Sequence, residues 1–150
     1  IIGKNDSNLK LAKILGMNLI NYKSIEKLKQ KYDVIFEVVG RKQDKTLQTA
    51  VYSIKPKGKI IVIGVFEKGF YGRLPLRNLF FKERLIIGSN SYGYFEGKDE
   101  FEMAVTMLKE LRKKFSRIIT HIMPLKDFRK GLKLLKEKKN SKVIKIVFRP

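Results

Sequence analysis

Two short apolar runs, each of which stops at a glycine, constrain the fold of this chain more than any other feature. The first run spans residues 33–40 and ends at Gly40, and the second spans residues 58–64 and ends at Gly64. A polar, helix-like segment over residues 41–54 separates them. Strands that are apolar on both faces are typical of parallel sheets in α/β proteins, where both faces are covered. Because ligands of such sheets bind at the carboxyl ends of the strands, the two glycines either lie at a ligand crevice or simply end their strands.

The rest of the chain alternates between strand-like and helix-like segments. A helix is predicted from an N-cap at Ser7 to Gly16, and Pro56 and Gly58 predict a turn before the second apolar run. The order of the elements predicts a doubly wound, parallel α/β sheet that forms one domain over residues 1–150. The other predicted helices cover residues 24–31, 45–54, 99–114 and 126–138, and the other strands cover residues 1–2, 19–22, 72–76, 86–91, 118–122 and 143–148.

Composition excludes several kinds of site. The chain has no cysteine, which excludes disulfides, thiolate catalysis and cysteine-bound zinc. It has a single histidine, His121, so we expect no histidine-built metal site. No apolar run approaches the roughly 18 residues of a membrane span, and the first residues do not resemble a signal peptide. We therefore expect a cytoplasmic protein with no membrane partner.

The positive charge is compatible with two interpretations. There are 34 Lys and Arg residues against 14 Asp and Glu, a net charge of +20, which would suit a protein that neutralises phosphates. However, the cations are spread along the chain, and in residues 126–140 they lie opposite an apolar face formed by Phe128, Leu132 and Leu135. We prefer a solvated, lysine-rich surface. A basic nucleic-acid-binding module remains the alternative.

Six segments, taken in order, resemble one known family. They cover residues 11–16, 33–41, 47–65, 83–89, 119–125 and 142–148. The sequence resembles the carboxyl-terminal part of the cofactor domain of the medium-chain dehydrogenases/reductases, in the zinc-type alcohol, threonine and sorbitol dehydrogenase group. No single segment is specific, but their order and spacing are. The Gly-x-Gly-x-x-Gly turn that follows the first strand of such domains is not found in the chain. The resemblance therefore implies a Rossmann-type sheet that lacks its first strand and glycine-rich loop.

The resemblance implies the cofactor-binding part of an NAD(P)-dependent oxidoreductase, inactive as a segment alone, that moves a hydride between nicotinamide and an alcohol or carbonyl. A non-catalytic nucleotide-binding remnant is the alternative. Three strand ends would line the cofactor site, with the first near adenosine, the second near the nicotinamide ribose and the third near the carboxamide. The residue facing the pyrophosphate would be Lys145, which could instead be a solvated strand lysine. The implied strand-end residues are Val38, Val39, Gly40 and Arg41, then Ile63, Gly64 and Val65, then Ser89 and Asn90.

The choice between NAD and NADP depends on the residue that ends the second strand of such domains. An acid there binds the ribose 2′-hydroxyl of NAD, whereas NADP binders avoid the acid and supply cations. The resemblance places Gly3 there, followed by Lys4 and Asn5, with Tyr22 on the neighbouring strand end. We therefore predict NADP, with NAD possible. A register shift of three would instead make Asp6 the ribose-binding acid.

The resemblance also implies that the first strand and a catalytic region are missing. Three explanations compete: the chain is part of a larger polypeptide, a second chain supplies the missing half, or the gene product has decayed. We prefer the first. Zinc would be present only if the missing region carries it, so we assign no catalytic or metal-binding residue. His121 is interpreted as structural, and Glu37 as a paired structural acid rather than a general base.

Family members commonly dimerise through edge strands of the cofactor domain. The segment over residues 72–76 is a candidate edge strand, and the apolar residues Leu79, Phe80 and Phe81 follow it. Pro75 would limit the number of ladder bonds that this edge can form. We predict a homodimer through residues 72–94. Alternatively, the three apolar residues cover the sheet of their own chain.

Overall fold

The computed structural model describes residues 1–21, 28–90, 92–137 and 142–150, and it has the α/β class that the sequence predicts. The chain forms two compact units, one made of residues 1–22 and 95–150 and the other of residues 23–94. Four pairs of described strands are parallel, as in βαβ folds. The described strands form sheets of two and three strands.

The first unit begins with a short βαβ element. Strand β1 (Ile2–Gly3) pairs with β2 (Ile20–Asn21), and helix α1 (Asp6–Ile14) connects them. The helix begins two residues earlier than predicted, because the side chain of Asn5, not Ser7, accepts a hydrogen bond from the Asn8 N–H (3.2 Å). It ends as predicted at Gly16, whose φ of 82° is easily adopted by glycine.

The rest of the first unit forms a second βαβ element. Strand β8 (Ile119–Pro124) pairs with β9 (Lys145–Arg149), and α6 (Phe128–Lys136) lies between them in sequence, after the 3-10 turn η3 (Leu125–Asp127). The rings of Phe128 and Phe148 pack with centroids 5.3 Å apart, which holds α6 against β9. The helix predicted over residues 99–114 is two helices, α4 (Glu100–Glu110) and α5 (Arg112–Phe115), which the 3-10 turn η2 (Ser116–Ile118) follows. A short pair, β6 (Tyr94–Phe95) and β7 (Lys98–Asp99), precedes α4.

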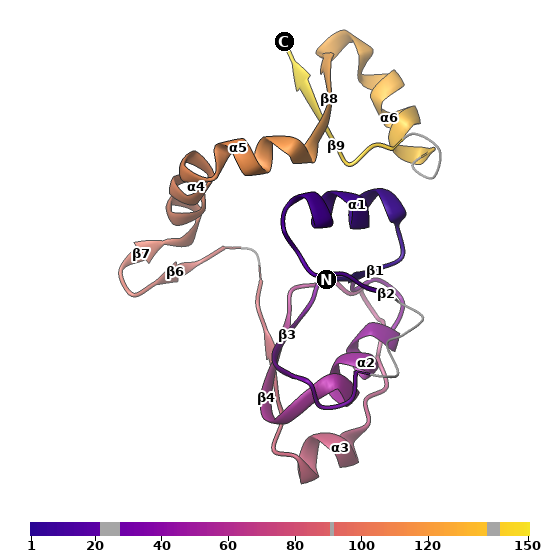
Figure 1. Cartoon of the computed structure of the whole chain (residues 1–150), viewed down its shortest axis with the longest axis vertical. Helices are drawn as coiled ribbons and strands as arrows, with labels where there is room; N and C mark the ends of the chain where they lie inside the picture. The colour runs from indigo at the N-terminus through magenta and orange to yellow at the C-terminus, as the bar shows by residue number, and fades with distance from the viewer. Residues whose placement is uncertain (22–27, 91, 138–141) are drawn as a thin grey trace. The chain divides into compact units, whose positions relative to one another are not determined.

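The second unit contains a three-stranded sheet in the order β3-β4-β5 (Figure 1). Its strands are β3 (Tyr32–Glu37), β4 (Ile54–Val62) and β5 (Leu85–Gly88). Helix α2 (Lys45–Ser53) connects β3 to β4, and α3 (Leu76–Phe81) precedes β5. The predicted turn before β4 lies within that strand, as an irregularity where the pairing register with β3 shifts and Lys57 has a φ of 61°. Of the helix predicted at residues 24–31, only residues 28–31 are described, and they are not helical.

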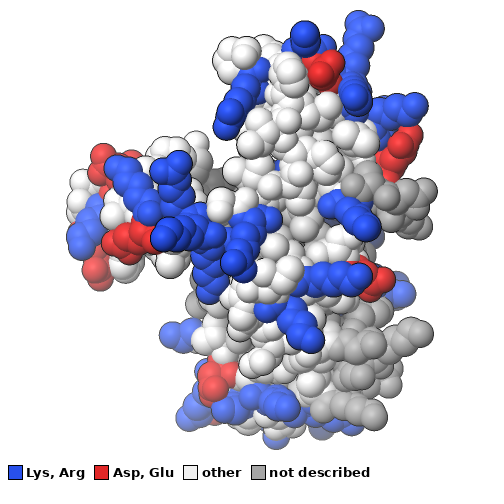
Figure 2. Space-filling view, turned by 45° about the horizontal axis from the view of Figure 1, so that its top comes forward, with Lys and Arg blue, Asp and Glu red and all other residues white. Residues whose placement is uncertain are grey.

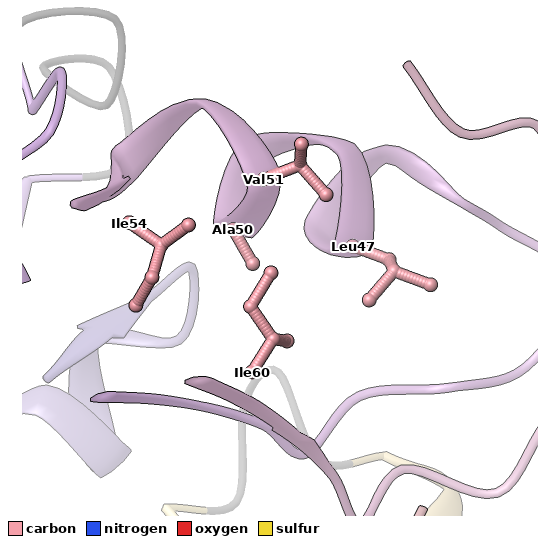
Figure 3. Packing of buried hydrophobic residues seen from close by; sticks show 5 residues of the cluster. All are labelled: Leu47, Ala50, Val51, Ile54 and Ile60. Atoms are coloured by element: carbon pink, nitrogen blue, oxygen red, sulfur yellow. The ribbon is translucent and has the colours of Figure 1, made fainter. Parts of the chain in front are cut away.

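The core of the second unit lies between α2 and the sheet. Figure 3 shows the Ala50 side chain of α2 directed toward Ile60, which rises from the strand, and Leu47 on the next turn of the helix. Val51, Ile54 and Ile60 are fully buried there. Val34 and Phe36, whose positions alternate with Ile35 along β3, are 46% and 62% exposed. Packing against α2 therefore fixes the positions of β3 and β4.

The predicted edge strand at residues 72–76 is wrong. Residues 71–75 have no regular structure, and Pro75 precedes the first residue of α3. Leu74 packs against the core of the second unit, so this segment is directed inward rather than along a sheet edge. Proline also lacks the N–H that a strand would use for pairing. The edge of the sheet is formed by β5 instead.

Arg84 anchors the start of β5 to the start of β4. Arg84 is 9% exposed, and its guanidinium donates hydrogen bonds to the carbonyl oxygens of Ile54 (2.7 Å), Asn78 (3.3 Å) and Lys55 (3.4 Å). Burial lowers the pKa of Arg84 below its ordinary value, because desolvation disfavours the charged form. The three carbonyl partners compensate for part of this cost.

Candidate functional site

The carboxyl ends of the three strands of the second unit lie side by side. The register aligns Glu37 of β3 with Val62 of β4, and Val62 with Gly88 of β5. The turns that follow these strands therefore start at the same edge of the sheet. In parallel α/β sheets this edge is where ligands bind.

The first turn reverses the chain through two residues with left-handed backbone. Gly40 has a φ of 58° and Arg41 a φ of 67°, and left-handed backbone is unfavourable for most side chains. The N–H of Arg41 donates a hydrogen bond to the carbonyl of Val65 (2.8 Å), which joins this turn to the one after β4. A Cβ on Gly40 would overlap with the Val65 carbonyl oxygen and lie 2.5 Å from its carbon. Glycine is required here by both its conformation and this close contact.

The second turn is joined to β3 by its main chain. The N–H groups of Ile63 and Gly64 both donate to the carbonyl oxygen of Glu37, at 2.8 and 2.9 Å. A Cβ on Gly64 would overlap with Oε2 of Glu37 and lie 2.5 Å from the Gly40 nitrogen. The two turns are thus packed main chain against main chain.

Glu37 is the charged residue at the centre of this arrangement. It is 3% exposed, and its Oε1 accepts hydrogen bonds from the N–H groups of Val39 (3.0 Å) and Gly40 (3.2 Å) and from the hydroxyl of Thr46 (2.7 Å). Its Oε2 is buried and has no hydrogen-bond partner in the part of the chain that the structure describes. The hydrogen bonds to Oε1 agree with the interpretation of Glu37 as a structural acid with partners, and these partners are uncharged donors.

The side chain of Gln43, which follows this turn, connects the turn to the start of α2 by hydrogen bonds. The Gln43 side-chain amide donates to the carbonyl of Gly40 (2.8 Å) and to the Thr46 hydroxyl (2.8 Å). Its oxygen accepts from the Thr46 N–H (3.2 Å) at the start of α2. The sequence analysis missed Gln43 and Thr46. The sequence pattern that could have indicated a hydrogen-bonded turn here is an acid at the end of an apolar run, Glu37, with a glycine three residues later.

The surface of the site is mainly apolar. Val38, Val39, Ile63 and Val65 are between 45% and 80% exposed at the ends of β3 and β4. Arg41 is exposed beside them. The third turn carries Ser89 and Asn90, both exposed, and the Ser89 N–H donates to the carbonyl of Val62 (2.9 Å).

The remaining predicted site residues lie elsewhere in the chain. Gly3 ends β1, Lys4 is exposed after it, and Asn5 caps α1, so Asp6 is a helical residue rather than the end of the strand. Lys145 is the exposed first residue of β9. These residues belong to the first unit. Tyr22 lies outside the described residues.

A zinc ion does not fit the part of the chain that the structure describes. No group of three or more histidine, cysteine, aspartate or glutamate side chains there could hold a metal ion. His121 lies in β8, with its Nδ1 3.0 Å from the Thr120 hydroxyl. Of the described helices, none has both the length and the apolar character needed to cross a membrane.

Comparisons with known proteins identify a family and a fold. A family model described as zinc-binding dehydrogenase matches residues 1–110. An alcohol dehydrogenase from Thermotoga maritima superposes with a TM-score of 0.80 at 21% identity, over 99% of this chain and 42% of that one. For the 2R,3R-butanediol dehydrogenase of Bacillus subtilis the TM-score is 0.77 at 22% identity, and the match covers 99% of this chain and 42% of that one. For L-idonate 5-dehydrogenase of Escherichia coli the TM-score is 0.75 at 22% identity, and the match covers 98% of this chain and 41% of that one. The chain spans about two fifths of these proteins' length. No curated protein matches the sequence.

Proposed function

We propose, from the premise that this chain belongs to the zinc-binding dehydrogenase family of medium-chain dehydrogenases/reductases, that it is the cofactor-binding part of a nicotinamide-dependent oxidoreductase. The complete enzyme would move a hydride between the nicotinamide and an alcohol or carbonyl, in the cytoplasm. This segment would bind and orient the cofactor.

One observation carries the proposal. The turns after β3 and β4 are held together by the hydrogen bond from Arg41 to Val65 and by the close approach of Gly64 to Gly40. They present apolar side chains and one arginine at the carboxyl edge of a parallel sheet. A ligand with flat aromatic rings joined by anionic groups suits such a surface, because apolar residues can cover the rings while a cation faces the anions.

In this proposal the three strand ends share the cofactor. Val38, Val39 and Gly40 would lie against the adenosine, with Arg41 near the adenine or ribose. The second turn would face the nicotinamide ribose, and the main chain of Ser89 and Asn90 would hold the carboxamide. Lys145 would face the pyrophosphate.

NADP is the proposed cofactor, and NAD is the competing one. Gly3 ends β1 and is followed by an exposed lysine, so the position where an acid would bind the NAD ribose carries none. Lys4 would then contact the 2′-phosphate, with Tyr22 beside it.

Titration of the purified chain with NADPH tests the proposal. We expect quenched or shifted nicotinamide fluorescence at micromolar ligand, and Arg41→Ala should weaken binding roughly tenfold, which corresponds to about 1.4 kcal/mol. Arg73→Ala is the matched control, because this exposed arginine of the same unit lies outside the proposed site. Salt-sensitive binding of unrelated DNA without a nicotinamide response would instead support the nucleic-acid alternative. Figure 2 shows Lys and Arg side chains on many separate parts of the visible face, which favours a solvated charged surface.

Two further parts of the proposal concern the complete protein. Zinc, if the enzyme uses it, would be held by residues outside this chain, as would the substrate. A homodimer would form through residues 72–94, with Phe80 and Phe81 of α3, which are 77% and 61% exposed, contributing apolar surface.

A further inference from the structure

Glu37 is a buried acid whose position needs a physical explanation. Glu37 ends β3 after three apolar residues and is 3% exposed, and its Oε2 has no hydrogen-bond partner among the described residues. Burying a carboxylate is costly, and a buried unpaired oxygen adds to the cost. Core packing alone would be served better by an apolar residue. An acid at this point therefore indicates a role that an apolar side chain could not fill.

The contacts of Oε1 indicate what that role is. Two consecutive N–H groups, those of Val39 and Gly40, converge on it at 3.0 and 3.2 Å, just before the left-handed residue Arg41. Converging main-chain N–H groups of this kind form a cradle that can bind an anion. Here the protein's own carboxylate fills the cradle. The turn is therefore closed to a phosphate, and its contacts with a ligand are left to the exposed side chains of Val38, Val39 and Arg41.

Glu37 also connects the first turn with its two neighbours. Its Oε1 accepts from the Thr46 hydroxyl (2.7 Å) at the start of α2, and its main-chain oxygen accepts from Ile63 and Gly64 of the second turn. Its Oε2 occupies the space in which a side chain of residue 64 would begin. One residue thus determines the shape of the first turn and its distance from the second.

We propose that Glu37 is a positioning residue for the nucleotide: its buried carboxylate holds the turn of residues 38–41 in the shape that contacts the adenosine side of the cofactor. This inference rests on the proposed function. It assigns to this acid no proton transfer and no contact with the ligand.

The test compares four variants for stability and for NADPH affinity. Glu37→Ala removes the acceptor, and Glu37→Gln keeps an acceptor oxygen of the same reach. Val51→Ala removes buried core volume from α2 without touching the turn, and Asp33→Asn alters the exposed acid at the other end of the same strand. Affinity is measured under conditions where each variant is folded by circular dichroism, because an unfolded fraction would lower the apparent affinity by that fraction. Hydrogen exchange of the Val39 and Gly40 amides is followed without ligand.

We expect Glu37→Ala to bind NADPH about tenfold or more weakly, the effect of losing hydrogen bonds to a charged group. Its Val39 and Gly40 amides should exchange faster, whereas Glu37→Gln should stay within about threefold of the parent affinity. Val51→Ala should lose stability but keep its affinity when folded, and Asp33→Asn should behave as the parent. Equal affinity losses in Glu37→Ala and Val51→Ala, or unchanged binding by Glu37→Ala, would overturn the positioning role of Glu37. The proposed cofactor-binding function would be unaffected by either result. No binding by the parent chain would overturn the proposed function, and this inference with it.

Discussion

Gly64→Ala is the substitution that most directly tests the packing of the two turns. The new Cβ would overlap with Oε2 of Glu37 and lie 2.5 Å from the Gly40 nitrogen and 2.9 Å from the Val39 nitrogen. The side-chain oxygen could shift, but the two nitrogens belong to main chain that is itself hydrogen-bonded to Glu37. Relief of the overlap would therefore require the two turns to separate.

The expected loss of stability follows from two opposing terms. Overpacking costs about 1–3 kcal/mol, and we take the upper end because main-chain atoms are involved. Alanine regains about 0.4–1 kcal/mol by restricting the unfolded chain. The net expectation is a loss of about 2 kcal/mol in the free energy of unfolding. With a urea dependence of about 2 kcal/mol per molar, the midpoint should fall by about 1 M.

Gly88→Ala is the matched control for this measurement. Gly88 ends β5 at the same edge of the sheet, has no positive φ, and nothing lies within 4 Å of where its Cβ would be. Its replacement should change stability by no more than about 0.5 kcal/mol in urea unfolding followed by circular dichroism. The reasoning is refuted if the two alanine variants unfold at the same urea concentration.

A double variant identifies which atoms cause the loss. Combining Glu37→Ala with Gly64→Ala removes the overlap with the carboxylate but leaves the two crowded nitrogens in place. We expect the double variant to be more stable than the sum of the two single effects would give, since the residues are in contact. Strict additivity would show that the carboxylate does not occupy the space beside Gly64.

Three further predictions concern other parts of the chain. Arg84→Met should cost about 2–4 kcal/mol in urea unfolding, because three carbonyl groups lose a charged donor, whereas Arg73→Met should be nearly neutral. Lys4→Ala should weaken NADPH binding by about 1–3 kcal/mol and leave NADH binding unchanged, and equal losses for both cofactors would contradict the 2′-phosphate assignment. Phe80→Asp should lower the mass measured by sedimentation, because α3 is proposed to lie in the dimer interface. An unchanged mass for a folded variant would show that α3 does not lie in that interface. Leu74 is unsuitable for this test because it packs against the core.

The regular elements could be predicted because their signals are local. The apolar run before Gly40 predicted β3, and the spacing of Leu47, Ala50 and Val51 agrees with a helix that packs on a sheet. Gly16 predicted the end of α1 correctly, since a left-handed helix end depends on the residue at that position. Membership of the dehydrogenase family was also recognisable from the order of such segments and is confirmed by the family match.

Local signals failed where two interpretations of a short segment were equally good. Residues 72–76 contain alternating apolar residues and predicted an edge strand, but burial of Leu74 against the core decided their path. Ser7 and Asn5 are both good N-caps, and the end of β1 at Gly3 decided between them. In each case a tertiary contact selected one of several locally acceptable conformations.

The sequence by itself determined most of the strands and helices, the glycines that follow the ends of β3 and β4, and membership of this family. Only the tertiary structure decided what those glycines do. The requirement for Gly40 and Gly64 arises because parallel pairing of β3 with β4 places Val65 against one and Glu37 against the other. Such contacts join residues more than twenty positions apart, and they depend on the register of the sheet, which no local pattern of residues specifies.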